Sequence, residues 1–386
     1  MSPNLPDKLG TVLPPLVLLV VALLLVSPLR GQDFTVVHVF DAATGDAALP
    51  SAAMIRVAGN FYGTTEGGGA YGYGSVFRFT PGTGEVTVLY SFAEEAGFPE
   101  GSLIIDKQHN LYGTTVVGGP SNRGTIFRLD AAGQETVLHA FTGGADGSQP
   151  YAGLVRDKAG NLYGTTWMGG EYDLGVVFKV TATGRFSVVH SFSGPGGAYA
   201  FPGPLVLDAE GNLYGTTALG GDNDQGTVYK VDPTGTEVVL YSFIGESDGS
   251  KPQAGVIRDE EGNLYGTTLS GGAEGYGTVF KLDTTGTKTI LHSFSGRDGK
   301  SPGTASLLRD KCGHLYGTTP YGGSGGWGVV YELDEDGNET VLHNFKWAKQ
   351  GRVPEAGLVQ DKNGNLYGST SEGGITWGTL FRLKTR

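Results

Sequence analysis

The side chains of this chain best suited to binding are aromatic rings with acidic neighbours. All four tryptophans fall in glycine-rich connecting segments, and two tyrosines occupy the same repeat position as two of them. Flat apolar rings beside carboxylate acceptors are what a site for a sugar ring or a peptide needs. The candidate ligand-binding residues are Trp167, Trp327, Trp347, Trp377, Tyr73, Tyr276, Asp173, Asp222 and Asp224.

Two other interpretations of these residues stay open. The rings can fill gaps between neighbouring loops, which would make them structural. The three aspartates can form the acidic site of a hydrolase or lyase, with or without a divalent ion, and two carboxylates within about 5 to 10 Å of each other would favour that enzyme. The segment from Asp222 to Gly226 is rich in oxygen ligands like a Ca²⁺ loop, but it lacks the later ligands and the bidentate glutamate of an EF-hand. We therefore predict no bound metal and no cofactor.

Histidine, a common acid–base and metal-binding side chain, is mostly part of the repeat. Five of the seven histidines share one position, which tyrosine fills in two other units, and this interchange favours packing over a site. No Ser-His-Asp spacing, His-x-x-x-His, Cys-x-x-Cys or phosphate loop stands out, so no catalytic residue is assigned. The shared position is occupied in chain order by His38, Tyr90, His139, His190, Tyr241, His292 and His343.

These side chains are positioned by a unit that the chain repeats seven times. Its clearest mark reads Leu-Tyr-Gly-Thr-Thr with small variations, and its tyrosine runs from Tyr62 to Tyr367. The first step is 50 residues and the next five are 51 residues. So strict a period indicates one supersecondary unit that is copied and stacked, because a lone unit cannot bury its apolar faces.

The sequence of each unit predicts four strands, which we name A to D. In the best-formed unit, two residues have identifiable roles, Asp259 in a turn and Gly266 in a strand. Asp259 closes the A–B hairpin, and Gly266 marks the close approach of a neighbouring backbone. Because strand direction alternates, the B–C and D–A connections share one face, which we call the long-loop face, and the short turns lie on the opposite hairpin face. The predicted strands of this unit are 254–258, 264–268, 278–282 and 289–294.

The two ends of the repeat region complement each other. The chain opens with a D-type strand at 34–40 and closes with a C-type strand at 378–383. The first strand would therefore complete the last blade and remove the open sheet edges. The sequence predicts an all-β, seven-bladed β-propeller of four-stranded blades over residues 34–386, and an open β-solenoid is the alternative. The enzyme interpretation would place the acidic site at the mouth of the channel.

Four arginines recur near the end of strand A, just before the hairpin. They could crowd one mouth of the channel and hold an anion, or they could cap turn carbonyls and pair with carboxylates. The four residues are Arg56, Arg156, Arg258 and Arg309.

The first 31 residues stand outside the repeat. An apolar run of 15 residues, 12–26, follows Lys8, which predicts an export signal over residues 1–31 that is cleaved near Gly31, or an uncleaved signal anchor. The net charge of −12 without a basic cluster argues against nucleic-acid and anionic-membrane binding. Cys312 is the only cysteine, so no intrachain disulfide can form. We expect a monomer that is secreted or held in the cell envelope, extracellular or periplasmic.

The repeat resembles two known groups. Gly255-Val256-Ile257-Arg258-Asp259 with Gly262-Asn263-Leu264-Tyr265 looks like an NHL-type propeller repeat. The fuller pattern, Gly-Asn-Leu-Tyr-Gly-Thr-Thr, a Gly-Gly loop, Gly-Thr-Val-Phe-Lys-Leu-Asp and Val-Leu-His-Ser-Phe, resembles the GloVer-type (choice-of-anchor) tandem-repeat proteins of bacteria. This resemblance implies an exported propeller without an established activity, often displayed through a C-terminal sorting anchor. Because the sequence stops at Arg386, directly after a strand, we do not expect that route of anchoring.

Together these observations predict an exported, non-enzymatic β-propeller that binds a glycan or peptide through its long-loop face. The alternative is an extracellular hydrolase or lyase with an acidic site at the channel mouth.

Overall fold

A computed structural model describes residues 33–94, 96–200, 203–346, 350–374 and 377–385. The chain divides into two compact units, Met1–Gly31 and Gln32–Arg386. The predicted export signal falls in the first unit and lies outside the described residues. Within the described ranges, no helix combines the length and the apolar character needed to cross a membrane.

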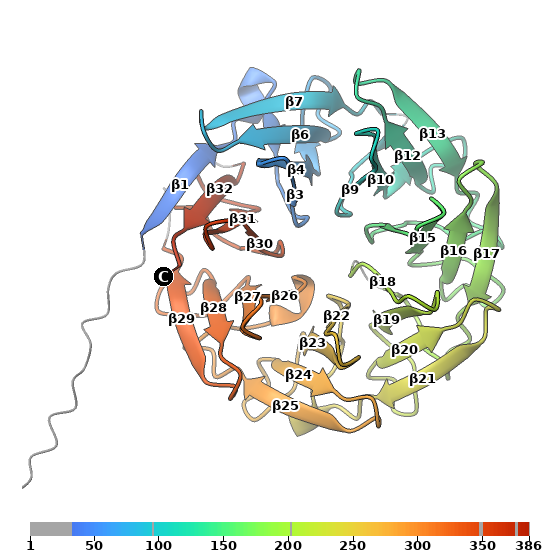
Figure 1. Cartoon of the computed structure of the whole chain (residues 1–386), viewed down its shortest axis with the longest axis vertical. Helices are drawn as coiled ribbons and strands as arrows, with labels where there is room; N and C mark the ends of the chain where they lie inside the picture. Colours follow the sequence, from blue (N-terminus) through green and yellow to red (C-terminus); the bar gives the residue numbers. More distant parts are fainter. Residues whose placement is uncertain (1–32, 95, 201–202, 347–349, 375–376, 386) are drawn as a thin grey trace, which may run out of the picture. The chain divides into compact units, whose positions relative to one another are not determined.

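The second unit consists of seven four-stranded antiparallel sheets arranged as blades around a central axis (Figure 1). The D-type strand is the outermost in every blade. From the innermost to the outermost strand, the blades are β3 (Ile55–Val57), β4 (Asn60–Thr65), β6 (Ser75–Thr80) and β7 (Glu85–Ser91) in blade 1; β9 (Ile104–Ile105), β10 (Leu111–Thr115), β12 (Thr125–Leu129) and β13 (Glu135–Ala140) in blade 2; β14 (Val155–Arg156), β15 (Leu162–Thr165), β16 (Val176–Val180) and β17 (Phe186–Ser191) in blade 3; β18 (Val206–Leu207), β19 (Leu213–Thr217), β20 (Thr227–Val231) and β21 (Glu237–Ser242) in blade 4; β22 (Val256–Arg258), β23 (Leu264–Thr268), β24 (Thr278–Leu282) and β25 (Lys288–Ser293) in blade 5; β26 (Leu308–Arg309), β27 (Leu315–Thr319), β28 (Val329–Leu333) and β29 (Glu339–Asn344) in blade 6; and β30 (Val359–Gln360), β31 (Leu366–Thr370), β32 (Thr379–Leu383) and β1 (Phe34–Val39) in blade 7.

Short elements complete the connections on the long-loop face. Two small sheets pair a D–A connection with a B–C loop, and isolated bridges do the same in the other blades, for example between Ser250 and Ser270. The prediction that these two kinds of connection share a face is therefore confirmed. The short elements are β2 (Ala47–Ala48) with β5 (Gly67–Gly68), β8 (Ala96–Gly97) with β11 (Val117–Gly118), and the 3-10 turns η1 (Ala42–Thr44), η2 (Glu246–Asp248) and η3 (Pro302–Thr304).

The predicted closure of the ring is confirmed by the pairing of β1 with β32. The two strands run antiparallel, with Phe34 opposite Leu383 and Val39 opposite Thr379. The first described strand thus becomes the outer edge of the last blade, as Figure 1 shows. The open solenoid is excluded by this pairing.

The repeated Thr-Thr pair explains how neighbouring blades are joined near the axis. The first threonine donates its hydroxyl to a carbonyl at the entrance of the next blade, as from Thr114 to the oxygen of Ala152 at 3.0 Å. The second closes its own loop, as where Thr115 donates to the oxygen of Val117 at 2.9 Å. The same blade-to-blade bond joins the two ends of the chain, from Ser369 to the oxygen of Pro50 at 3.1 Å.

The motif glycine makes room for an aromatic ring rather than for a neighbouring backbone. A Cβ atom placed on Gly266 would lie 2.7 Å from the ring of Phe280 on the adjacent strand, and only 3.2 Å from the nearest backbone oxygen. The sequence correctly predicted a close approach at Gly266, but the group that approaches is chiefly the Phe280 side chain and not a backbone. This ring belongs to the apolar layer between blades.

The recurring hairpin aspartate has the turn role that the sequence predicts. In blade 5 Asp259 accepts hydrogen bonds from the backbone and the side-chain amide of Asn263, at 2.7 and 2.8 Å, and from the hydroxyl of Tyr265 at 3.0 Å. Burial alone would raise the pKa of this carboxyl, but these hydrogen bonds outweigh burial and lower the pKa.

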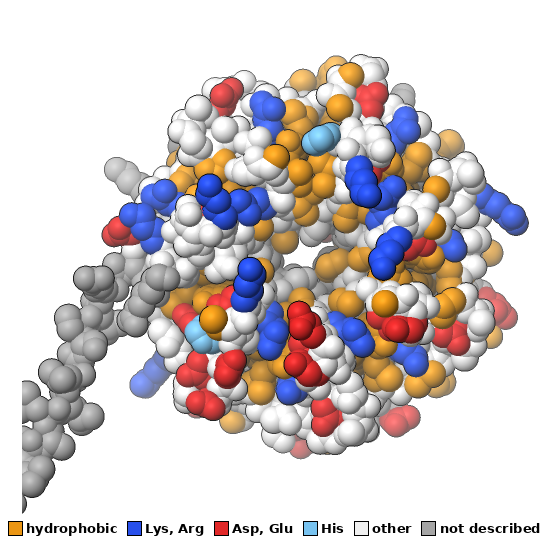
Figure 2. Space-filling view, in the orientation of Figure 1, with side chains coloured by type: hydrophobic (Ala, Val, Ile, Leu, Met, Phe, Trp, Pro, Cys, Tyr) orange, Lys and Arg blue, Asp and Glu red, His pale blue; other side chains and the backbone are white. Residues whose placement is uncertain are grey.

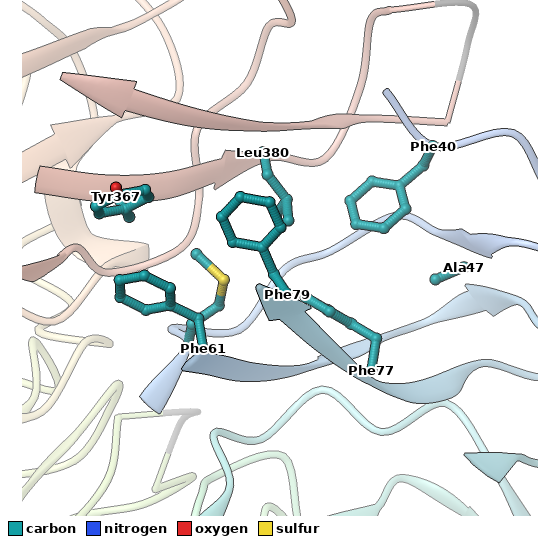
Figure 3. Packing of buried hydrophobic residues seen from close by; sticks show 8 residues of the cluster. Phe40, Ala47, Phe61, Phe77, Phe79, Tyr367 and Leu380 are labelled. Carbon is teal, nitrogen blue, oxygen red and sulfur yellow. The ribbon is translucent and has the colours of Figure 1, made fainter. Parts of the chain in front are cut away.

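Apolar packing between adjacent blades supplies the core. Figure 3 shows this layer where blade 7 meets blade 1: Tyr367 and Leu380 face the rings of Phe61, Phe77 and Phe79. The rings of Phe61 and Tyr367 have centroids 4.4 Å apart. Because each phenylalanine buries a large apolar surface, these layers hold the blades, and so the loops, in fixed positions.

Candidate functional site

Three glutamates meet at the long-loop mouth of the central channel. Glu66, Glu100 and Glu355 line one cavity of about 180 Å³, together with serine and threonine hydroxyls. The cavity is central, because its lining comes from blades 1, 2, 4, 6 and 7. The hydroxyl residues are Ser51, Ser102, Thr304 and Ser306.

The repeat explains how these glutamates reach the mouth. Glu66 directly follows the Thr-Thr pair of β4, and Glu100 and Glu355 each follow the proline that precedes an innermost strand. The first position follows the second strand of a blade and the other precedes the innermost strand, so both lie on the long-loop face near the axis. Other blades place neutral residues there, so the acidity belongs to three consecutive blades, 7, 1 and 2.

Crowding and burial change the protonation of this cluster. Burial, and then the charges of Glu66 and Glu355, raise the pKa of Glu100 to about 8. Burial also raises the pKa of Glu66 and of Glu355. Tyr151 belongs to the same surroundings, because burial and the charges of Glu100 and Glu66 raise the pKa of its hydroxyl. At neutral pH the Glu100 carboxyl is therefore mostly protonated within this cluster of three.

An exposed aromatic surface adjoins this cluster. Trp377 is 38% exposed and Phe98 is 37% exposed, and both line a second cavity of about 460 Å³. Glu66 lines both cavities, so a carboxylate is shared between the acidic mouth and the indole. Tyr71, which is 64% exposed, lies between two residues that line the second cavity.

The other predicted rings are half-buried against neighbours. The Arg352 guanidinium lies 4.6 Å from the centre of the Trp327 ring, and the Lys300 ammonium lies 5.0 Å from the centre of the Tyr276 ring. Trp167 packs against Tyr199 at 4.8 Å between centroids.

Tyr73 lies edge-to-face with Phe98, at 6.1 Å between ring centroids, and so contacts a ring that lines the cavity of Trp377. Trp347 falls outside the described residues.

The predicted aspartates are exposed and do not line the acidic cavity. Asp173 accepts a hydrogen bond from the Gly169 amide at 2.9 Å, and Asp224 accepts one from the Gly220 amide at 2.7 Å. The backbone of both has positive φ, 58° and 54°, so each closes its own tight turn. Asp222 is exposed beside Asp224. The structure thus gathers other acids at the mouth, and sequence reasoning missed them.

The histidine position lies on the outermost strand of each blade, far from the channel. His139 contacts Asp146 at 3.1 Å and stacks on Phe186 of the next blade at 3.7 Å between centroids. His190 contacts Glu237 of the next blade at 3.2 Å. Across the described ranges, no group of three or more His, Cys, Asp or Glu side chains is arranged to hold a metal ion.

Solved structures share this fold at low sequence identity. Virginiamycin B lyase from Staphylococcus aureus matches with a TM-score of 0.60 and 10% identity, over 92% of this chain and 100% of that one. An oligogalacturonate lyase in complex with manganese matches with a TM-score of 0.59 and 13% identity, over 92% and 96%. An extracellular domain described as part of a one component system from B. thetaiotaomicron matches with 0.57 and 17%, over 92% of this chain and 43% of that chain.

At these identities the likeness establishes the fold and no activity. No curated protein matches the chain. The sequence does match the Gloeobacter/Verrucomicrobia repeat, over residues 26–204 and again over 201–386. These two tandem matches cover the propeller, and the chain belongs to the Gloeobacter/Verrucomicrobia repeat family.

Proposed function

We propose that this protein is an exported, non-enzymatic glycan-binding propeller whose site is the long-loop mouth of the channel. The observation that carries the proposal is the position of Glu66, which lines both the acidic cavity and the cavity of Trp377. A sugar ring can lay its C–H face on the exposed indole while its hydroxyls donate to the neighbouring carboxylates.

A glycan suits this site better than an extended peptide does. The two cavities are compact, about 180 and 460 Å³, and hydroxyl and carboxyl groups surround the first of them. A peptide bound as an added strand would need an unpaired sheet edge, whereas the innermost strands are only two or three residues long. A sugar needs only the platform and a few convergent polar groups.

A glycan array with the purified propeller tests this proposal. We expect binding that Trp377→Ala and Glu66→Gln each weaken at least about tenfold, as loss of a buried anchor does. Trp327→Ala is the matched control, because Trp327 occupies the same repeat position but is half-buried beneath Arg352. Equal binding by the wild type and the Trp377→Ala and Glu66→Gln variants would reject the site, and a hit on a peptide array alone would reject the glycan.

One observation favours an enzyme as the second candidate. A glycan lyase or hydrolase needs a protonated carboxyl beside an ionised one. Burial, and then the charges of Glu66 and Glu355, raise the pKa of Glu100 to about 8, so Glu100 can supply the protonated carboxyl. Incubation of array-selected glycans with the wild type and the Glu100→Gln variant distinguishes the two functions. New reducing ends that form with the wild type but not with the variant would establish the enzyme. Glycans that stay intact with both proteins would favour the binding function.

Export and a monomeric state complete the proposal. The apolar run at 12–26 supports export. N-terminal sequencing of the protein recovered from its native host tests this, and we expect a mature chain that starts near Gly31. Light scattering coupled to size exclusion is expected to give the mass of one chain.

A further inference from the structure

The opposite mouth of the channel carries arginines instead of glutamates. Arg56, Arg156, Arg258 and Arg309 lie in the innermost strands β3, β14, β22 and β26, directly before the turns of the hairpin face, and all four are exposed. Figure 2 shows Lys and Arg side chains gathered around the central opening. Because the whole chain has a net charge of −12, this positive charge is confined to one region of the surface.

Aromatic rings of the preceding blade hold two of these guanidinium groups. Arg258 lies 5.6 Å from the centre of the Tyr214 ring, and Arg309 lies 5.7 Å from the centre of the Tyr265 ring. Three of the arginines, Arg156, Arg258 and Arg309, also pack over the glycine of their own turns; a Cβ on Gly262, for example, would meet the Arg258 guanidinium at 3.0 Å. Side chains fixed in this way lose little conformational entropy when a ligand arrives.

The arginines keep their hydrogen-bonding capacity. Across the parts of the chain that the structure describes, none of the four forms an ion pair within 4.0 Å. The charges of Arg258 and Arg309 act on Asp208 and Asp259 of the preceding blade, but these two carboxylates accept their hydrogen bonds from their own turns. The guanidinium forks are therefore open to a carboxylate from outside.

Charged residues in the adjacent turns are distributed unevenly around this mouth. The A–B turns of blades 6, 7, 2 and 3 each carry an exposed lysine, whereas those of blades 4 and 5 carry exposed glutamates. A positive arc thus runs from blade 6 past blade 1 to blade 3. The lysines are Lys311, Lys362, Lys107 and Lys158, and the glutamates are Glu210, Glu260 and Glu261.

A groove beside the arc offers apolar surface for a sugar. A cavity of about 560 Å³ between blades 3 and 4 is lined by Arg156 and Lys158, by the Tyr163 ring and Leu207, and by three carboxylate side chains. The carboxylates are those of Asp157, Asp208 and Glu210. An acidic sugar fits this groove when its carboxylate faces Arg156 and Lys158, its ring packs on the tyrosine and its hydroxyls donate to the lining carboxylates.

We propose that the hairpin-face mouth binds a short oligosaccharide that carries carboxylate groups, with Arg56, Arg156, Arg258 and Arg309 as the carboxylate-binding residues. This site is separate from the long-loop mouth, and neither proposal depends on the other.

Calorimetric titration of the propeller with a galacturonic acid trimer, and with a neutral galactose trimer, tests the proposal. We expect binding of the acidic trimer only, weakening as salt rises from 50 to 300 mM because the contacts are ionic. The double variant R258Q/R309Q should lose at least about tenfold in affinity. K251Q/R297Q removes the same charge from exposed side chains of the long-loop face and should change the affinity less than about twofold.

Three results would overturn the proposal. The first is that the wild type binds neither trimer, or binds both equally. The second is that R258Q/R309Q, shown by circular dichroism to be folded, binds the acidic trimer as tightly as the wild type does. The third is that a single-stranded oligonucleotide of equal charge binds as tightly as the acidic trimer, because the site would then recognise charge and not a carboxylated sugar.

Discussion

Replacing Glu100 by Gln should stabilise the protein at alkaline pH and leave its stability unchanged near pH 4.5. Burial and the charges of Glu66 and Glu355 raise the pKa of Glu100 from 4.5 to about 8 in the folded chain. Between these two values the unfolded chain has released the proton while the folded chain retains it. The free energy of unfolding therefore falls as pH rises from about 4.5 to about 8. Glutamine stays neutral throughout and does not incur this loss.

The size of the effect follows from the pKa difference. A carboxyl whose pKa rises from 4.5 to about 8 loses at most about 5 kcal/mol of stability on ionising. Because Glu100 lines a cavity that is open to solvent, we expect about 2 kcal/mol. Urea unfolding of the wild type and the variant at pH 4.5 and pH 8 measures this difference.

The control is Glu94→Gln, an exposed carboxyl in the same connection before β9. It should change the unfolding free energy by less than about 0.5 kcal/mol at either pH. If Glu100→Gln had the same effect at both pH values, or were destabilising at pH 8, the glutamates would not be crowded at the mouth as described.

The remaining predictions concern the fold that positions both mouths, and urea unfolding checks each. Gly266→Ala should cost about 1 to 3 kcal/mol, because the new methyl would lie 2.7 Å from the Phe280 ring, and Phe280→Leu in the same chain should restore part of the loss; an additive double variant would contradict this. Thr318→Val should cost about 1 kcal/mol by removing the 3.1 Å bond to the Ala356 oxygen of the next blade, and a neutral effect would argue against this joint. Phe34→Ala should cost about 3 kcal/mol, since Phe34 stacks on His343 at 3.7 Å and packs on Phe381 across the closing seam; an unchanged midpoint would mean that β1 does not stabilise the ring.

The strands were predictable where the repeat motif fixes their ends. In blade 5 the second and third strands occupy the predicted ranges, 264–268 and 278–282. The first begins at Val256, two residues later than predicted, because Gly255 has φ of +74° and the Ala254 oxygen accepts a hydrogen bond from Ser306 of the next blade. Period and turn chemistry specify a strand's centre, whereas contacts between blades decide where it starts.

The acidic mouth was harder to predict because it depends on closure. Glu355 and Glu66 are nearly 300 residues apart in sequence, yet they become neighbours when blade 7 meets blade 1. One sequence signal could have identified these glutamates. At two repeat positions, directly after the Thr-Thr pair and directly after the proline, most units carry a neutral residue and these units carry glutamate. The aspartates that were predicted instead sit in loops whose turns they close.

Hydrogen exchange of the propeller with and without a neutral array-selected glycan tests the central claim most directly. We predict protection confined to the segments 66–72 and 98–102 and to the segment that begins at Trp377, which form the long-loop mouth. Turns of the hairpin face, such as 130–133, should exchange unchanged. Protection of those turns, or none at Glu66, Glu100 and Trp377, would contradict the claim that the acidic mouth and its indole form the glycan site.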